Sequence, residues 1–246
     1  MDNRIFITVN VNESGHLYQT IAKNKLHLIH ELTIHGYFNC YADKSVIGSM
    51  CNTLDESGKR TGGQLDTIDL SKAKIASSWG EPDYRLGYDT FKNCITLKKI
   101  ILSKLYDINA KGFSGCVSLT SIEYMGCYHF VSKKGVLYQI GRWETFQNQP
   151  KYKQFVNGTQ ILVKYPAAKQ DVEDIDFTCI NKIEDYAFED FKGTDLYLPG
   201  IPPSCTELAF FNVDTSKITL HVNKDFFNSY WSHPVWGNFQ IVVDEK

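Results

Sequence analysis

Two neighbouring segments of the chain repeat one apolar pattern, and this repeat limits what the chain can fold into. Residues 91–102 and 113–124 carry Phe, Cys, Leu and Ile at identical offsets, so the pattern recurs after 22 residues. The matched residues are Phe91, Cys94, Leu97 and Ile100 in the first copy, and Phe113, Cys116, Leu119 and Ile122 in the second. A fixed period in the twenties is typical of solenoids, in which each coil buries its apolar side only against its neighbours. The sequence therefore predicts a stack of coils.

The repeat predicts one short strand per coil, and it returns near the end of the chain. Phe188 and Phe210 are 22 residues apart, and so are the segments 196–198 and 218–220. Because side chains alternate along a strand, two residues of each strand should point into the core. These pairs are Leu32/Ile34, Ile68/Leu70, Ile100/Leu102, Ile122/Tyr124, Ile175/Phe177, Leu196/Leu198 and Ile218/Leu220. We expect one continuous parallel sheet, with a column of phenylalanines on the far side of the core: Phe91, Phe113, Phe188 and Phe210.

The first 64 residues are interpreted as an N-terminal α/β cap with a first, irregular repeat. A period of two over residues 5–11 predicts a strand, and Ser14 is a candidate cap for a short helix after it. Asp43 is a candidate cap for a second helix. The apolar face of that helix consists of Val46, Ile47, Met50, Cys51 and Leu54. Repeats are assigned to residues 65–222, and the whole chain is expected to form one continuous solenoid domain.

Two further segments interrupt or close the repeats. Residues 135–138 and 160–166 are predicted to be the strands of a β-hairpin inserted at about 128–171. The polar but aromatic residues between them, 141–155, are expected to form an irregular projecting loop. Residues 223–246 are predicted to form a C-terminal cap with a short helix followed by a strand, since the last coil of a solenoid otherwise exposes its core to water.

The repeat consensus, Phe-x-Gly/Asn-Cys-x-x-Leu-x-x-Ile-x-Leu, resembles the BspA-like leucine-rich repeats that are common in surface proteins of gut and oral Bacteroidetes. Residues 135–138 and 162–166 are similar to the hairpin of that family, and residues 230–239 look like its closing cap. The resemblance covers roughly residues 26–246, although the loop from 142 to 155 is longer than in the family. It implies a right-handed leucine-rich repeat solenoid with a parallel sheet on one side. It also implies export and a cell-surface or secreted location, although the first residues lack a signal-peptide layout.

Composition and motifs argue against several other functions. The net charge is −2 and the sequence pI is about 6.4, so no basic excess indicates a nucleic-acid partner. No apolar run is long enough to insert into a membrane. The seven cysteines form no CxxC pair and the histidines form no HExxH motif, so neither a metal nor a cofactor is predicted. Cys116 stands where a nucleophile elbow around Ser114 would need glycine. No catalytic set can be assembled, and the chain is not expected to be an enzyme.

Cys94 and Cys116 occupy the same slot of successive coils. The favoured interpretation is two buried free thiols that act as small apolar residues. A disulfide or a reactive thiol is the alternative, because stacked strands lie only about 4.8 Å apart.

Residues between the inward positions of each strand face outward and form rows across the predicted sheet. The rows are Thr33 and His35, Asp69 and Ser71, Ile101 and Ser103, Glu123 and Met125, Asp176, Tyr197, and Thr219 and His221. Several are apolar or aromatic where a solvated face would favour charge, and exposed aromatics on rigid surfaces are common anchors in recognition. The candidate binding residues are therefore Ile101, Glu123, Met125 and Tyr197, with a wall from the hairpin made of Trp143, Phe146, Tyr152 and Phe155. Alternatively, the hairpin aromatics fold back onto their own strands and Tyr197 is merely a good strand former.

The resemblance also implies surface attachment and protein or glycan binding, and it leads to a functional hypothesis with two alternatives. The leading hypothesis is a non-catalytic cell-surface module that binds a protein or glycan ligand, host or extracellular, through its repeat surface. The first alternative is a structural spacer that displays another domain. The second is an enzyme with its site on the aromatic hairpin, for which the sequence offers no oriented acid, base or nucleophile.

Overall fold

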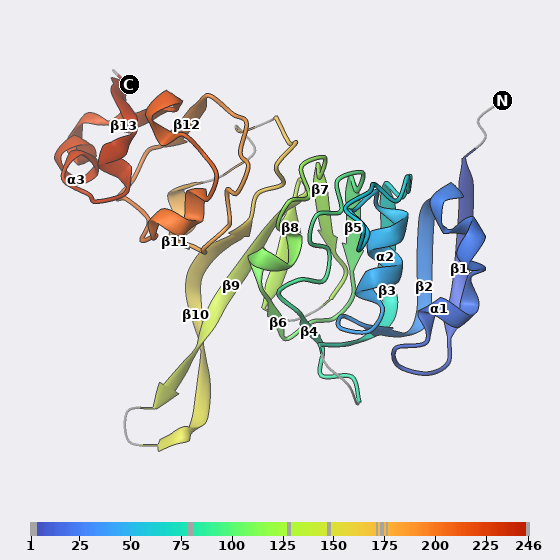
Figure 1. The fold of residues 1–246 in the computed structure, drawn as a ribbon. Helices are drawn as coiled ribbons and strands as arrows, with labels where there is room; N and C mark the ends of the chain where they lie inside the picture. The colour runs from blue at the N-terminus through green and yellow to red at the C-terminus, as the bar shows by residue number, and fades with distance from the viewer. Residues whose placement is uncertain are drawn as a thin grey trace.

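The computed structural model shows a repeat fold whose coils lie side by side along the molecule (Figure 1). It describes residues 4–77, 81–126, 129–146, 149–170, 172, 175 and 177–244, and the side chains of residues 141–159 lie outside this description. The early and late coils occupy opposite ends of the molecule, and a long hairpin projects from between them (Figure 1). We call the two ends the N-terminal stack (residues 4–126) and the C-terminal stack (residues 177–244).

A five-stranded parallel sheet forms one side of the N-terminal stack. In spatial order its strands are β1 (Ile5–Val11), β2 (Ile29–Asn39), β3 (Thr67–Ala76), β5 (Lys99–Leu102) and β7 (Ser121–Tyr124). The predicted register is confirmed here, because Leu32 pairs with Ile68, Ile68 with Ile100, and Ile100 with Ile122. These four side chains are at most 1% exposed. Strand alternation thus places the predicted residues in the core.

Short helices and turns form the other side of the N-terminal stack. They are α1 (Leu17–Thr20), α2 (Lys44–Met50) and the 3-10 helices η1 (Lys23–Leu28) and η2 (Ala110–Phe113), with a two-strand ladder of β4 (Arg85–Leu86) and β6 (Asp107–Ile108). Val46, Ile47 and Met50 are buried on α2, as predicted. Leu54 is exposed instead, because α2 ends at Met50 and Leu54 lies in the turn beyond it.

The two predicted helix caps have a different role. Neither Ser14 nor Asp43 accepts a hydrogen bond from the start of the helix that follows it. Asp43 is fully buried and accepts hydrogen bonds from the backbone nitrogens of Leu17 (3.1 Å) and Asn39 (2.8 Å). Ser14 Oγ accepts from the Asn39 side chain at 3.0 Å. Both residues therefore tie separate segments of the cap together, which a local capping pattern does not reveal.

Four coils turn at the same position, two residues after the phenylalanine. The residues there have positive φ: Asn93 (60°), Gly115 (71°), Asp190 (57°) and Asn212 (59°). Among ordinary residues this left-handed conformation is routine only for Gly, Asn and Asp. The requirement explains the Gly/Asn position of the repeat. At Gly115 a Cβ would also lie 2.3 Å from Asn93 Oδ1 of the preceding coil.

The repeat phenylalanines are buried and stacked, as predicted, within each stack. Phe91 and Phe113 have ring centroids 5.9 Å apart, and Phe188 and Phe210 have centroids 5.0 Å apart with an interplanar angle of 3°. All four side chains are at most 4% exposed. Neighbouring coils are also joined by backbone hydrogen bonds beside these rings, from Phe91 N to Gly112 O and from Phe188 N to Ala209 O. Each ring thus anchors a coil to the next one.

A three-stranded parallel sheet forms one side of the C-terminal stack. Its strands are β12 (Asp195–Leu198), β13 (Thr219–Asn223) and β14 (Gln240–Asp244). The predicted register is wrong by two residues here, because Leu196 pairs with Leu220 and not with Ile218. The 3-10 helix η6 (Thr215–Lys217) lengthens the approach to β13. A shift of two preserves the alternation, so the predicted inward residues remain buried.

The end of the chain packs its aromatic residues against the last coil. A short helix, α3 (Phe227–Trp231), precedes β14, as predicted. The 3-10 helices of this stack are η4 (Phe177–Cys179), η5 (Glu207–Phe210), η6, η7 (Lys224–Phe226) and η8 (Trp236–Asn238). Trp236 and Phe239 lie edge-on to Phe210, at centroid distances of 5.4 and 5.0 Å. These contacts shield the open face of the phenylalanine column from water.

The inserted segment forms a sheet between the two stacks, and one strand of the C-terminal stack completes it. The inserted strands are β8 (Phe130–Lys133), β9 (Val136–Phe146) and β10 (Gln149–Lys164), and the strand of the C-terminal stack is β11 (Ile180–Ile183). The predicted hairpin is confirmed, since β9 and β10 are antiparallel with Tyr138 opposite Leu162. The prediction of an irregular loop over residues 141–155 is wrong, because both arms continue as paired strands to Phe146 and Gln149. The pairing satisfies the backbone groups of an arm that projects away from both stacks (Figure 1).

The predicted single parallel sheet is interrupted by this insertion. Ile175 and Phe177 do not form the next strand, because Phe177 begins the 3-10 helix η4. The open edge of β7 is occupied instead by the start of the hairpin: Ile122 N donates to Gly135 O (2.9 Å) and Tyr124 N to Ser132 Oγ (3.0 Å). A backbone N–H that already donates to one acceptor is no longer available to pair with a further strand. Ile175 and Phe177 are nevertheless buried, at 7% and 5% exposure.

The base of the hairpin separates two hydrophobic cores. Leu137 and Val163 pack into the core of the N-terminal stack. Their neighbours Tyr138 and Leu162 pack into the core of the C-terminal stack. Alternation along β9 and β10 thus gives each core one face of the hairpin.

A buried ion pair lies where the hairpin meets the C-terminal stack. Lys164 on β10 is 2% exposed; its Nζ donates to Tyr186 O at 2.8 Å and lies 3.4 Å from Glu189 Oε2. Burial lowers the pKa of Lys164, and the nearby Glu189 carboxylate opposes that shift. Cys116 and Cys94 are buried free thiols, as predicted, and burial raises the pKa of Cys116.

Candidate functional site: a cleft beside the C-terminal sheet

Strand register brings two aromatic side chains together on the outward face of the C-terminal sheet. Tyr197 on β12 pairs directly with His221 on β13. Their rings are stacked, with centroids 4.4 Å apart and an interplanar angle of 13°. Leu196, Leu198 and Leu220 point into the core, which leaves Tyr197 and His221 on the outer face. The tyrosine remains 46% exposed.

Two carboxylates from neighbouring strands hold the imidazole of His221. Its Nε2 lies 3.1 Å from Asp195 Oδ1 on β12, and its Nδ1 lies 3.0 Å from Asp244 Oδ1 on β14. Protonated histidine has a donor on both ring nitrogens and can satisfy both carboxylates at once. Partial burial lowers the pKa of His221, but the hydrogen bonds to Asp195 and Asp244 outweigh this effect, so the pKa is raised from its ordinary value. The arrangement therefore favours an imidazolium between two carboxylates.

Asp195 is fixed by a second hydrogen bond. Thr194 Oγ1 donates to Asp195 Oδ2 at 2.6 Å. The hydrogen bonds from Thr194 and His221 lower the pKa of Asp195. Both oxygens of Asp195 are thus engaged, whereas Asp244 uses only Oδ1 within the part of the chain that the structure describes.

A cleft opens beside this cluster, with a volume of about 320 Å³. Its walls consist of Ile175, Phe177, Tyr197, Leu198, Pro199, His221, Val222, Asn223 and Asp244. Most of the lining is apolar, and the polar groups come from the outward residues of the three strands. Small-ligand sites typically combine apolar walls with a few placed polar groups. The cleft can therefore hold a small group of a ligand.

The structure splits the predicted binding residues between two separate surfaces. Ile101 and Glu123 are neighbours on β5 and β7, and Met125 follows β7 with 66% exposure. Tyr197 lies in the other sheet, so the predicted single row across all coils does not exist. The side chains of Trp143, Phe146, Tyr152 and Phe155 lie outside the described residues, as does Asp176.

The outward face of the N-terminal sheet is less suited to binding. Glu123 Oε1 forms an ion pair with Lys99 Nζ at 2.7 Å. Ser103, predicted to face outward, is 5% exposed and donates its hydroxyl to Ala73 O at 3.0 Å. It is turned inward because β5 ends at Leu102 and alternation stops there.

The sequence predicted that His221 faces outward but did not identify it as a binding residue. It gave no indication that Asp195 and Asp244 belong to the site. The 22-residue period put Tyr197 opposite Thr219, whereas the observed pairing puts it opposite His221. A search for exposed aromatics one strand away at offsets of 22 to 24 residues would have found the pair. Asp244 lies beyond the repeats, and no repeat pattern indicates that β14 joins the sheet.

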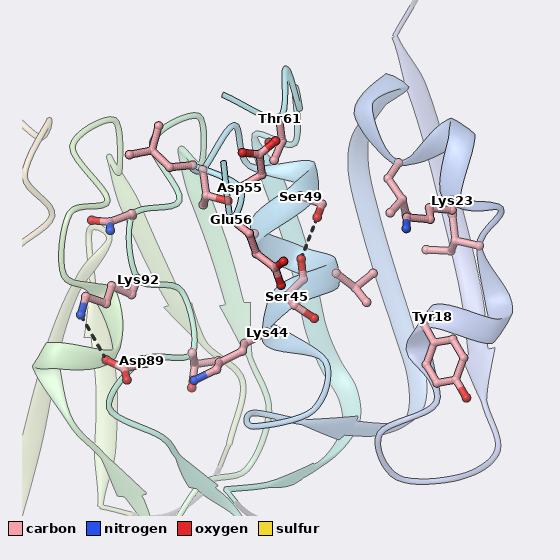
Figure 2. A pocket seen from close by; sticks show the side chains of 18 of the residues that line it. Tyr18, Lys23, Lys44, Ser45, Ser49, Asp55, Glu56, Thr61, Asp89 and Lys92 are labelled. Carbon is pink, nitrogen blue, oxygen red and sulfur yellow. Dashed lines mark hydrogen bonds and ion pairs between the residues drawn. The ribbon is translucent and has the colours of Figure 1, made fainter. Parts of the chain in front are cut away.

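A second and larger hollow lies on the helical side of the N-terminal stack. Figure 2 shows this open groove, which runs across α2 between α1 and η1 on one side and the turn at Asp89 on the other. Its volume is about 1120 Å³. Its charged lining residues are Lys23, Lys44, Lys92, Asp55, Glu56 and Asp89. Positive and negative side chains are mixed, and Lys92 pairs with Asp89 at 3.9 Å. This mixture selects no class of ligand.

Among the described residues, no group of three or more His, Cys, Asp or Glu side chains is placed to hold a metal ion. Within the same residues, none of the helices is long and apolar enough to cross a membrane.

One segment of the chain matches a known protein family. Residues 79–135 match the family model described as the BspA type leucine rich repeat region (6 copies). A solved leucine-rich cell surface protein from Faecalibacterium prausnitzii A2-165 is similar at 12% identity and a TM-score of 0.33, with 92% of this chain aligned. The alignment spans 66% of the length of that protein. No curated protein matches the sequence.

Proposed function

Residues 79–135 are BspA-type leucine-rich repeats, and from this premise we propose that the chain is a non-catalytic binding module displayed at a cell surface. The repeats support a rigid body whose outward positions are free to carry recognition residues. We further propose that the ligand, a protein or a glycan, is held at the C-terminal cleft. The single observation that carries this proposal is the exposed Tyr197 ring stacked on His221 beside the cleft.

The Tyr197–His221 ring stack is exposed to water and held in place by neighbouring side chains. An aromatic ring that is 46% exposed on a sheet leaves apolar area in contact with water. His221 is held by Asp195 and Asp244, so the ring stack is preorganised and loses little conformational entropy when a ligand binds. Aromatic anchors of this kind dominate the energetics of many interfaces.

Adhesion of protein-coated beads tests the function directly. Beads carrying the full chain are expected to adhere to cultured epithelial cells in a saturable way, and an excess of the soluble chain should displace them. Beads coated with albumin and beads coated with the heat-unfolded chain serve as controls. Adhesion no stronger than the controls, on cells and on mucin-coated plates alike, would favour the spacer alternative.

A further inference from the structure

Among the described residues that line the C-terminal cleft, Asp244 and His221 form an ion pair at 3.0 Å, and neither lysine nor arginine is present. Asp195 also bonds His221, so this cluster has two carboxylates for one imidazolium. An anionic group would have no cation to itself and would approach Asp244 and the nearby Asp195. An ammonium group would have to compete with an imidazolium that already sits between both carboxylates.

The shape of the lining suits a flat ring with an apolar face and a polar rim. His221 covers one face of the Tyr197 ring from the β13 side. The opposite face is turned away from β13, since β12 is the edge strand of this sheet. Phe177 and Ile175 line the cleft together with Tyr197. A ligand in the cleft therefore finds its apolar surface mainly on the Tyr197 ring, because Ile175 and Phe177 are only 7% and 5% exposed.

Polar groups of two further residues line the same cleft. Asp244 Oδ1 accepts from His221, and its Oδ2 has no partner within the described residues. Asn223 also lines the cleft; its Oδ1 accepts from the Asp225 backbone at 2.9 Å, which orients its amide nitrogen as a donor. A carboxylate oxygen and an amide nitrogen together can accept from and donate to vicinal hydroxyl groups.

From these observations we infer that the C-terminal cleft binds an uncharged sugar unit of a glycan, with its apolar face on Tyr197 and its hydroxyl groups toward Asp244 and Asn223. This inference rests on the proposed binding function and specifies its ligand. A pyranose ring combines an apolar C–H face with hydroxyl groups around its edge, and it needs no counter-charge from the cleft. The volume of about 320 Å³ lies at the small end of the range for ligand pockets.

His221 acts as a positioning residue in this site. It faces Asp195 and Tyr197 from β12 and Asp244 from β14. When His221 loses its second proton, the imidazole keeps a donor for only one of the two carboxylates. One of the two carboxylates then loses its hydrogen bond, and the cluster becomes more anionic. Sugar binding should therefore weaken as the pH rises through the pKa of His221.

Isothermal titration with a defined panel tests the inference. The panel contains neutral glucose, galactose and mannose trisaccharides together with one sialylated and one sulfated trisaccharide. At about pH 6, below the ordinary histidine pKa of about 6.5, at least one neutral trisaccharide should bind and the charged ones should bind more weakly. Tyr197→Ala and Asp244→Asn should each weaken binding at least about tenfold, which corresponds to about 1.4 kcal/mol. Met125→Ala, an exposed apolar residue of the other sheet, is the matched control and should leave binding unchanged.

Further variants separate a binding role from a structural one. Tyr197→Phe keeps the ring and should retain most of the affinity, which keeps the test valid if Tyr197→Ala does not fold. His221→Gln should flatten the pH dependence as well as lower the affinity. The inference is overturned if no neutral trisaccharide binds at millimolar concentration, if a charged trisaccharide binds best, or if Tyr197→Ala and Asp244→Asn both bind like the parent chain.

Failure of the sugar inference can be distinguished from failure of the proposed binding function. Adhesion of coated beads that neutral trisaccharides do not inhibit, and that protease treatment of the cells abolishes, would leave a binding module whose ligand is a protein. That outcome overturns the sugar inference alone. Absence of both adhesion and sugar binding would overturn the proposed function as well.

Discussion

The N-terminal and C-terminal stacks share their internal construction but differ on their outward faces. Both place a residue of positive φ two positions after a buried phenylalanine, as at Gly115 and Asn212. On the outside, the N-terminal sheet carries a Lys99–Glu123 ion pair, whereas the C-terminal sheet carries the Tyr197–His221 ring stack. The comparison teaches that the repeat determines what lies in the core. Residues at the outward positions do not pack in the core, so they can differ between the two stacks and carry different functions.

A second difference lies inside the two cores. The slot filled by Cys116 in the N-terminal stack is filled by Phe191 in the C-terminal stack. Cys116 Sγ donates to Phe91 O at 3.0 Å, whereas the Phe191 ring lies edge-on to Phe188 at 5.4 Å. The next C-terminal coil has Val213 in this slot. The two stacks thus fill one position of the repeat with different residues.

Truncating one phenylalanine column at a time should give the largest effects and show whether the stacks are independent. Phe113→Ala and Phe188→Ala should each lower the free energy of unfolding by about 3–5 kcal/mol, as for other buried phenylalanines. Hydrogen exchange should then rise first in residues 99–124 for Phe113→Ala and in residues 180–222 for Phe188→Ala. A uniform rise along the whole chain for either variant would show that the hairpin does not separate the two cores.

The buried ion pair tests the attachment of the hairpin to the C-terminal stack. Glu189→Leu should destabilise the protein by about 3 kcal/mol, because it leaves the Lys164 ammonium buried beside Tyr186 without its carboxylate. The double variant Lys164→Met/Glu189→Leu should recover most of the loss, since it removes both charges. Chemical denaturation of the three proteins measures the difference. A double variant no more stable than Glu189→Leu would mean that the lysine contributes packing rather than charge.

The repeated turn offers a smaller test at a single position. Gly115→Ala should cost about 1–2 kcal/mol, because alanine at φ 71° is strained and its Cβ would lie 2.3 Å from Asn93 Oδ1. Gly200→Ala is the matched control, since a Cβ there meets nothing within 4 Å. Thermal unfolding of the two variants should separate them clearly. Equal melting temperatures would argue that the turn relaxes without penalty.

The smallest expected effect is the pH dependence of the C-terminal stack. The folded-state pKa of His221 is raised, so its protonation stabilises the fold fully below the unfolded pKa of about 6.5. This contribution should be lost as the pH rises through the folded pKa. It should amount to at most about 1 kcal/mol, because Asp195 and Asp244 are 42% and 41% exposed. His221→Gln should abolish the dependence, and an unchanged slope in that variant would assign it to another group.

Sequence reasoning succeeded where a residue type follows from a repeated physical requirement. Burial of Phe91 and Ile100, and the position of Gly115 in a turn, all follow from the 22-residue pattern. It failed where a non-repeating contact decides the outcome. The hairpin occupies the edge of β7 through Gly135, so Phe177 cannot continue the sheet. Likewise, the extra turn before β13 moves His221 opposite Tyr197, which a fixed period cannot anticipate.

The central claim is that recognition takes place on the C-terminal sheet and not on the N-terminal one. A matched pair of variants, Tyr197→Ala and Met125→Ala, compares the two faces in the bead-adhesion assay on epithelial cells. Both side chains are exposed, at 46% and 66%, and neither is part of a core. The account predicts that Tyr197→Ala beads detach at a much lower shear force than parent beads, while Met125→Ala beads behave like the parent. The reverse order, or equal loss in both variants, would contradict it.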